Sequence, residues 1–285
     1  MAIKTVWLGL NFEDPPPSDP KQSYTGGRYA VELCAQEGAH LTAFLAAPVF
    51  KIPGVVPGMG LIPGFNAPAD QVNAQRLALA EKTREAILNF AEQARVTADV
   101  KIEQDIYAKL QESLLASARP SDILVIRRPG NYRALDRPLI ETVLFASGRP
   151  ILLVPAGWAR GAKLEKAVVA WDGSGRAARA VGDAIPLLAR AGEVQVITVS
   201  SASAKAAPVA GLLAHLARHC KKVAIRDLPV RPEGIASTLR KHATEYGADL
   251  LVMGAYAHPR ILETFVGGVT SDMLVGAELP IFLSH

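Results

Sequence analysis

The sequence predicts an α/β protein made of two tandem, doubly wound units, each with a five-stranded parallel sheet. Three observations predict this class. The strand-like segments are continuous apolar runs, which indicates burial on both faces of a sheet. Helix-like segments separate these runs, as they do in βαβ units. The chain has 285 residues, of which 49% are hydrophobic, and at roughly 150 residues per domain this length is enough for two cores.

Two strand-like motifs occur twice in the chain. The segment DILVI at 122–126 returns as DLLVM at 249–253. The segment RPILLV at 149–154 returns as LPIFLS at 279–284. Motifs that recur at nearly one offset predict that the two halves of the chain share a fold.

Each half is expected to form one domain, the first at 1–157 and the second at 164–285, joined by the Gly- and Ala-rich segment 156–163. In each half, a Gly-containing turn follows the first apolar run and precedes a helical stretch. In the first half we expect strands at 5–11, 41–47, 122–126 and 149–154, and helices at 26–38, 69–95 and 107–117. In the second half we expect strands at 166–172, 194–200, 249–253 and 279–284, and helices at 173–192, 208–219, 234–246 and from about 269.

Composition excludes several classes of protein. The formal charge is +4, with 31 basic against 27 acidic residues, which is too small a surplus for a DNA-binding face. Cys34 and Cys220 are the only cysteines, so a disulfide scaffold is excluded. No apolar run reaches the 18–20 residues of a membrane span, and the N-terminus lacks the pattern of a signal peptide. We therefore expect a cytoplasmic protein that neither spans a membrane nor binds DNA.

The segment 48–68 is apolar yet rich in Pro and Gly. This composition excludes a helix or a central strand. Long loops of this kind often serve as lids or binding segments. We expect the insertion to pack on the other domain or on a second chain, and contact with a lipid surface is the less favoured alternative because helical amphipathicity is absent.

The loop after Met253 has the features of a phosphate-binding site. Roughly fifteen residues separate this strand from the next expected helix, where such loops usually have about 2–6. Gly254 would let a ligand approach the backbone, and Gly267 and Gly268 can aim consecutive N–H groups at one point. Thr270 would add a hydroxyl at a helix N-terminus, which favours anions. The alternative is that these glycines are ordinary turn residues.

The same residues resemble a motif of the universal stress proteins. That family carries an aspartate after its first strand, and Asp172 stands at this position. After the fourth strand it carries Gly-x2-Gly-x9-Gly-Ser/Thr, which reads here as Gly254-x2-Ala257-x9-Gly267-Gly268. The second half therefore resembles a universal stress protein domain, and the whole chain resembles a tandem member.

This resemblance implies an adenine nucleotide in the second domain: ATP, or ADP or AMP. Adenine would lie near Trp171, Asp172 and Val199, and the ribose would lie between Met253 and Gly254. The phosphates would lie on Gly267 to Thr270. The implied site is Trp171, Asp172, Val199, Met253, Gly254, Ala257, Gly267, Gly268, Val269 and Thr270. Ala257 and Gly268 depart from the family pattern.

The first half departs further from the motif. Its first strand ends in Leu10 and Asn11 without an aspartate, and Pro129 would remove an N–H donor from a phosphate site. We expect this half to have lost nucleotide binding and to act as a packing partner. Arg127 and Arg128 are expected to face water, with an anion site as the alternative.

Other residues of chemical interest carry weaker signals. His215 and His219 have the spacing of a metal pair, but a third ligand is lacking, so no metal site is expected. His258 is a candidate phosphate contact, and a solvent-facing histidine is the alternative. Ser174 is expected to cap a helix and Cys34 to lie in a core. No catalytic residue is identified.

We therefore predict a nucleotide-responsive stress or signalling module. Two alternatives remain open: a slow ATPase in which Asp172 holds Mg²⁺, and an interaction protein whose clefts bind no nucleotide. In the family, dimers commonly form through the fifth strand. The runs 151–155 and 281–284 could therefore pair within one chain as a pseudo-dimer, and two chains could form a homodimer.

Overall fold

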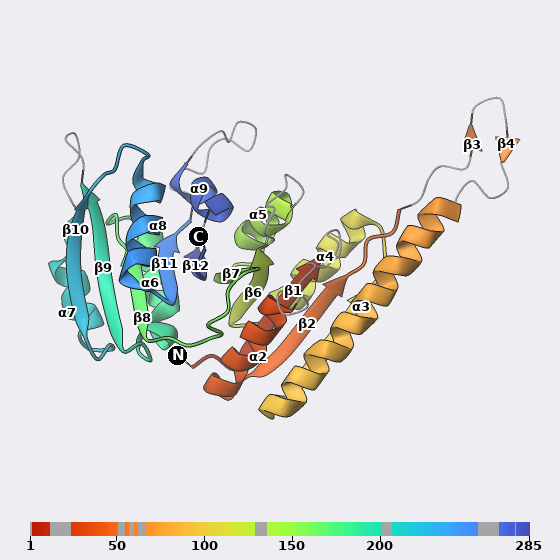
Figure 1. Ribbon diagram of the computed structural model, residues 1–285, viewed down its shortest axis with the longest axis horizontal. Helices are drawn as coiled ribbons and strands as arrows, with labels where there is room; N and C mark the ends of the chain where they lie inside the picture. The colour runs from red at the N-terminus through yellow and green to blue at the C-terminus, as the bar shows by residue number, and fades with distance from the viewer. Residues whose placement is uncertain are drawn as a thin grey trace.

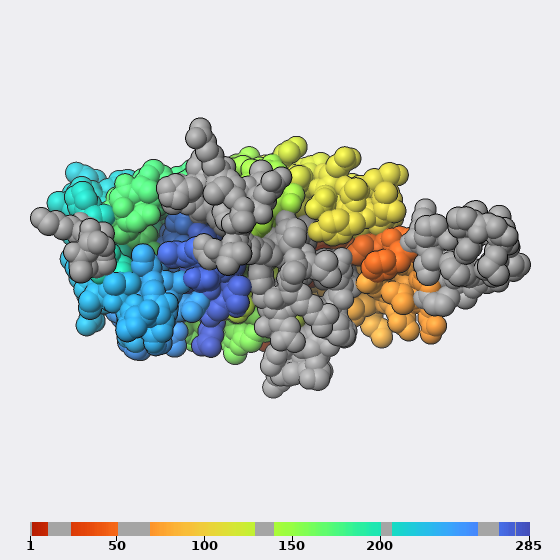
Figure 2. Space-filling view, turned by 90° about the horizontal axis from the view of Figure 1, so that it is seen from above, coloured from red at the N-terminus to blue at the C-terminus, as the bar shows by residue number. Residues whose placement is uncertain are grey.

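A computed structural model gives the structure of the chain. It describes residues 2–11, 24–50, 55–56, 60–61, 67–128, 136–200, 207–255, 268–276 and 278–285. The molecule is elongated, and its two halves lie side by side along the long axis (Figures 1 and 2).

Each half contributes five strands to the main sheet. The first half contributes β1 (Thr5–Asn11), β2 (His40–Ala46), β5 (Ala98–Glu103), β6 (Ile123–Arg128) and β7 (Ile151–Pro155). The second contributes β8 (Lys166–Ala170), β9 (Glu193–Ser200), β10 (Val223–Pro229), β11 (Leu250–Gly254) and β12 (Ile281–Ser284). Within each half all neighbouring strands are parallel, which confirms the predicted α/β class.

The two halves form one continuous sheet. Its order is β10-β9-β8-β11-β12-β7-β6-β1-β2-β5. The only antiparallel pair in the described sheet is β7 with β12, where Leu152 lies opposite Phe282. This pair is the intramolecular pseudo-dimer contact expected from the runs 151–155 and 281–284.

Helices cover both faces of the sheet (Figure 1). One face packs against α2 (Thr25–Glu37), α3 (Ala67–Ala94), α6 (Gly175–Leu188) and α7 (Ala210–Leu216). The other packs against α4 (Tyr107–Ala118), α5 (Asp136–Ala146), α8 (Ile235–Tyr246) and α9 (Val269–Gly276). Each face therefore has its own hydrophobic core, and each core runs through both halves.

A repeated aspartate fixes the correspondence between the halves. Asp122 Oδ2 accepts hydrogen bonds from the backbone N–H groups of residues 4 and 5, at 2.7 and 2.9 Å. Asp249 Oδ2 accepts the same pair from residues 165 and 166, at 2.8 and 2.9 Å. Residue 5 therefore corresponds to residue 166, and the strand registers extend the alignment across the sheet.

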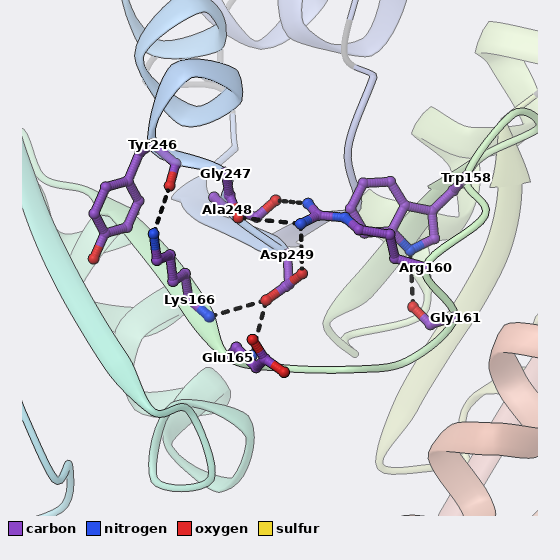
Figure 3. Close-up of polar contacts among 9 residues, drawn as sticks. All are labelled: Trp158, Arg160, Gly161, Glu165, Lys166, Tyr246, Gly247, Ala248 and Asp249. Carbon is purple, nitrogen blue, oxygen red and sulfur yellow. Dashed lines mark hydrogen bonds and ion pairs between the residues drawn. The ribbon is translucent and has the colours of Figure 1, made fainter.

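The linker between the halves is held against the second half (Figure 3). The Arg160 guanidinium donates to the carbonyls of Gly247, at 3.2 Å, and Ala248, and forms an ion pair with Asp249 at 3.1 Å. The guanidinium also lies 4.4 Å from the centre of the Trp158 ring. The linker is thus a fixed connection rather than a loose tether.

Most of the insertion 48–68 lies outside the described residues. Its described parts include the two-residue strands β3 (Val55–Val56) and β4 (Gly60–Leu61), which pair antiparallel. Figure 1 places them beyond the start of α3, at the end of the molecule farthest from the second half. These described parts therefore do not pack on the second half, and packing of the segment on a second chain stays a prediction.

Within the described residues, no helix is both long enough and apolar enough to cross a bilayer.

Candidate functional site

The strand order of the second half reverses between β8 and β11. From β8 the chain proceeds outward to β9 and β10, then returns to place β11 on the other side of β8. The two strands are parallel, with Val169 opposite Val252, so their carboxyl ends lie side by side. Ligands of doubly wound sheets bind at such a reversal.

Trp171 and Asp172 follow β8 at this position. The Trp171 backbone N–H donates to Ile197 at 2.8 Å, and its ring Nε1 donates to the carbonyl of Pro208 at 3.1 Å. The Asp172 side chain is exposed, and its Oδ1 accepts from the Ser174 N–H at 2.9 Å. Asp172 thus carries its carboxylate at the rim of the sheet in a turn that fixes its backbone.

Ser174 begins the next helix. Its Oγ accepts from the backbone N–H of Ala177 at 3.1 Å, which confirms the predicted N-cap of α6. The N-terminal turn of α6, with its remaining N–H groups, therefore lies next to the strand reversal.

Gly254 ends β11 and packs tightly on α6. A Cβ at this position would lie 2.7 Å from both the Arg176 carbonyl carbon and the Ala177 nitrogen. In the first half, Arg127 is the counterpart of Gly254 and the glycine is on the helix: a Cβ on Gly26 would lie 2.9 Å from the Arg127 Cβ. The structure thus gives Gly254 a role in helix packing, and the ligand approach expected from the sequence stays a prediction.

The remaining predicted site residues lie on neighbouring elements. Met253 is buried near the end of β11, and Val199 is half-buried near the end of β9, the strand on the other side of β8. Val269 and the buried Thr270 begin α9 at the predicted position, and Gly268 precedes them in an exposed position. Ala257 and Gly267 lie outside the described residues.

Comparison with known structures identifies the architecture. A universal stress protein from Archaeoglobus fulgidus DSM 4304 matches with a TM-score of 0.67 at 14% identity, over 98% of this chain and 97% of its own. A protein of unknown function from Pseudomonas aeruginosa PAO1 matches with a TM-score of 0.53 at 14% identity, over 99% and 92%. The chain has the universal stress protein fold.

The similarity is one of structure. No model of a protein family matches the sequence, and no curated protein matches it. The match to the Archaeoglobus universal stress protein covers nearly the full length of both chains, so the fold is shared by both halves and not by one domain alone.

The first half of this universal stress fold differs from expectation at Arg128. The side chain is buried, and its Nη1 donates to the carbonyl of Val275 at 2.8 Å. The expectation that this arginine faces water was wrong, because β6 lies near the centre of the sheet and its end meets α9 of the other half. Arg128 therefore connects the first half to the helix that begins at Thr270.

The other candidates lie apart from the strand reversal. His215 and His219 are exposed, with ring centres 4.9 Å apart. No group of three or more metal-binding side chains occurs among the described residues. Cys34 is fully buried, and burial raises its pKa to about 12, which confirms it as a core residue. His258 lies outside the described part of the chain.

Proposed function

We propose that the second half, over 164–285, binds ATP or a related adenine nucleotide and that the protein acts as a nucleotide-responsive module of the universal stress type. One observation carries the proposal. The strand reversal between β8 and β11 brings the exposed carboxylate of Asp172 and the N-terminus of α6 to one edge of the sheet. This is where doubly wound folds bind nucleotides.

The chemistry of the available groups suits such a ligand. Adenine would contact Trp171, Asp172 and Val199: the half-buried side chains of Trp171 and Val199 offer apolar surface beside the exposed carboxylate of Asp172. The ribose would lie at the end of β11. The phosphates would lie at the start of α9, where helix N–H groups and Thr270 favour an anion.

Regulation would act through α9. Its N-terminal turn would bind the phosphates, and its Val275 carbonyl accepts the hydrogen bond from Arg128 of the first half. A nucleotide that favours one position of this helix would shift the surface presented to a partner. The first half would then be a companion that holds α9 in place and binds no nucleotide itself.

The test has a direct readout. The protein is purified without added nucleotide and denatured, and the released small molecules are identified by mass spectrometry, after which ATP binding is measured by calorimetry. The variant Asp172→Ala should weaken ATP binding about tenfold or more, because it removes a charged polar contact. Asn11→Ala, at the corresponding position of the first half, is the matched control and should leave it unchanged.

Two results would overturn the proposal. One is a protein that releases no adenine nucleotide and shows no ATP binding at millimolar concentration. The other is equal ATP affinity in Asp172→Ala and the unaltered protein, which would place any nucleotide away from the end of β8.

A further inference from the structure

A cavity of about 370 Å³ lies between the edge strand β10 and α8. Cavities that bind small molecules usually have volumes of about 300–1,000 Å³. Its lining is polar at the base and cationic at the rim: Arg226, Leu228, Pro229, Arg231, Thr238, His242, Glu245 and Tyr246. None of these residues belongs to the proposed nucleotide site.

The first half fills the corresponding space with aromatic rings. Trp7 and Phe44 are fully buried there, and their ring centres lie 6.5 Å apart in a stacked arrangement. The strand registers make Val168 the counterpart of Trp7 and Ile197 the counterpart of Phe44. Two large rings are thus replaced by smaller side chains on the neighbouring strands β8 and β9, although neither of these side chains lines the cavity itself.

The helix that covers this space also differs between the halves in its buried residues. Both α4 and α8 have twelve residues, so aligning their first residues pairs Leu110 with Thr238 and Leu114 with His242. The two leucines are buried, and so are the two polar residues. A buried polar side chain is costly unless it is satisfied, and both are satisfied within the chain: Thr238 Oγ1 accepts from the Arg231 N–H and donates to the Gly234 carbonyl, each at 2.9 Å, and His242 Nε2 lies 2.6 Å from Gln195 Oε1. The second half thus has polar groups where the first half has leucines.

The two halves also differ in the charged residues of the edge strand that borders this space. In the first half, Lys101 on the edge strand pairs with Glu103 at 2.5 Å. The registers place Arg226 where Lys101 stands and Leu228 where Glu103 stands. Arg226 has no ion pair within the described part of the chain, and its positive charge borders the cavity without a carboxylate of its own.

The other charged groups that line the cavity do not neutralise the positive charge of Arg226. Arg231 and Glu245 form an ion pair at 3.3 Å and so balance one another. His242 Nε2 lies 2.6 Å from Oε1 of Gln195 on β9, and its ring stacks on Tyr246. Burial lowers the pKa of His242, the guanidinium groups of Arg226 and Arg231 lower it further, and Glu245 opposes them. The imidazole is therefore neutral at pH 7, and the cavity carries one net positive charge.

We propose that this cavity binds a small organic molecule that carries one oxyanion group, a carboxylate or a phosphate, on a compact apolar body. The oxyanion would pair with Arg226, since a guanidinium binds either group through two parallel hydrogen bonds. The apolar body would lie against Leu228, Pro229 and the Tyr246 ring. Thr238 and His242, whose hydroxyl and Nε2 are bonded within the chain, would form part of the lining. The site is independent of the proposed nucleotide.

The test uses the full chain and three probes of one shape. Benzoate and phenyl phosphate carry the two oxyanions, and benzamide is the neutral control. Calorimetry should show saturable binding of at least one anion and about tenfold weaker binding of benzamide, because the charge-assisted contact is lost. Which anion binds more tightly identifies the group as carboxylate or phosphate.

Variants locate the site. Arg226→Gln should weaken the anion about tenfold or more, whereas Lys101→Gln, the matched change in the first half, should have no effect. Thr238→Leu, which installs the residue of the first half, should fill the cavity and abolish binding. By NMR, saturation with the anion should raise the pKa of His242, because a bound negative charge favours the imidazolium.

The inference is overturned if neither anion binds in a saturable way, or if Arg226→Gln binds as tightly as the unaltered protein. An anion that binds at the start of α9 would bind Arg226→Gln as tightly as the unaltered protein, so this measurement distinguishes the two sites. ATP affinity should be the same in Arg226→Gln and the unaltered chain, so that failure of one proposal does not imply failure of the other.

Discussion

A single glycine at the junction of strand and helix occurs in each half, but on opposite elements. In the first half it is Gly26 of α2, which lies against Arg127. In the second half it is Gly254 of β11, which lies against the first turn of α6. Close approach at this junction needs one residue without a side chain, and either element can provide it. The glycine thus positions the N-terminus of the helix relative to the strand ends.

The role of Gly254 can be measured through stability. Gly254→Ala should lower the free energy of unfolding by about 1–3 kcal/mol, because the new methyl group would overlap the backbone of α6 and force a local shift. Urea denaturation followed by circular dichroism gives the value. Gly175→Ala is the control, since no described atom lies within 4 Å of that Cβ. Its effect should stay within about 0.5 kcal/mol, and equal costs for both would contradict the packing role.

Residue patterns predicted where part of the candidate site lies. The sequence placed Asp172 after a strand and the start of a helix near Val269, as the structure has them, because a strand-end aspartate and a Gly-Gly-Val-Thr helix start are local signals. Nucleotide binding by these residues stays a prediction. It missed the burial of Arg128 and the cavity beside Arg226. Both depend on which residues lie opposite one another across the sheet, and only the strand registers show that Leu228 stands where the first half has Glu103.

Among the elements, the linker of residues 156–163 binds the turn that follows α8. The last carbonyls of a helix lack internal partners, and the helix dipole favours a cation there. Lys166 Nζ donates to the carbonyl of the last helical residue, Tyr246, at 3.1 Å, whereas Arg160 donates to the carbonyls of the next two residues, Gly247 and Ala248, and pairs with the buried Asp249 (Figure 3). Both cations lie at the C-terminal end of α8, where the dipole favours them. The linker thus joins α8 to the start of β8, whose N–H groups bind the same aspartate.

Removing the Arg160 contacts should destabilise the chain measurably. Arg160→Met keeps most of the aliphatic stem but removes the donors, so the free energy of unfolding should fall by about 1–2 kcal/mol. The comparison is Arg84→Met, which removes an exposed ion pair with Glu81 and should cost less than about 0.5 kcal/mol. Both values come from urea denaturation at pH 7. Similar losses in the two variants would show that the Arg160 contacts add nothing beyond a surface ion pair.

The sequence predicted the central strands of the sheet but not its edge strands or α5. The central strands were found because burial on both faces makes them continuous apolar runs. The edge strands β5 and β10 were not located, because both are partly exposed and neither is a continuous apolar run: β5 alternates polar and apolar residues, and β10 carries Arg226 and Asp227 in its middle. The helix α5 was not located either. Its sequence DRPLIETVLFA has a proline near the start, which is a poor signal for a helix.

At the scale of the whole molecule, the two hydrophobic cores do not correspond to the two halves. One core contains Leu41 of the first half and Val196 of the second, and the other contains Trp7 and Ile197. Phe282 on β12 lies opposite Leu152 on β7, at the junction between the halves. A core shared in this way predicts that neither half unfolds without the other.

Hydrogen exchange can test that coupling within one sample. Peptides from β2 and β9, measured by mass spectrometry in increasing denaturant, should lose protection at the same denaturant concentration. Phe282→Ala should lower the unfolding free energy by about 3–5 kcal/mol, and it should do so equally for both peptides. If β2 keeps its protection while β9 loses it, the halves unfold separately and the cores are not coupled.

The antiparallel pair of β7 and β12 has one more consequence. In an assembly of two identical subunits, symmetry gives every substitution two copies. Here the partners belong to one polypeptide, so Trp7 can remain an aromatic ring on one side while its counterpart Val168 is small on the other. A ligand of the β10–α8 cavity should accordingly bind with a stoichiometry of one per chain, and its isotherm should show no cooperativity between equivalent sites.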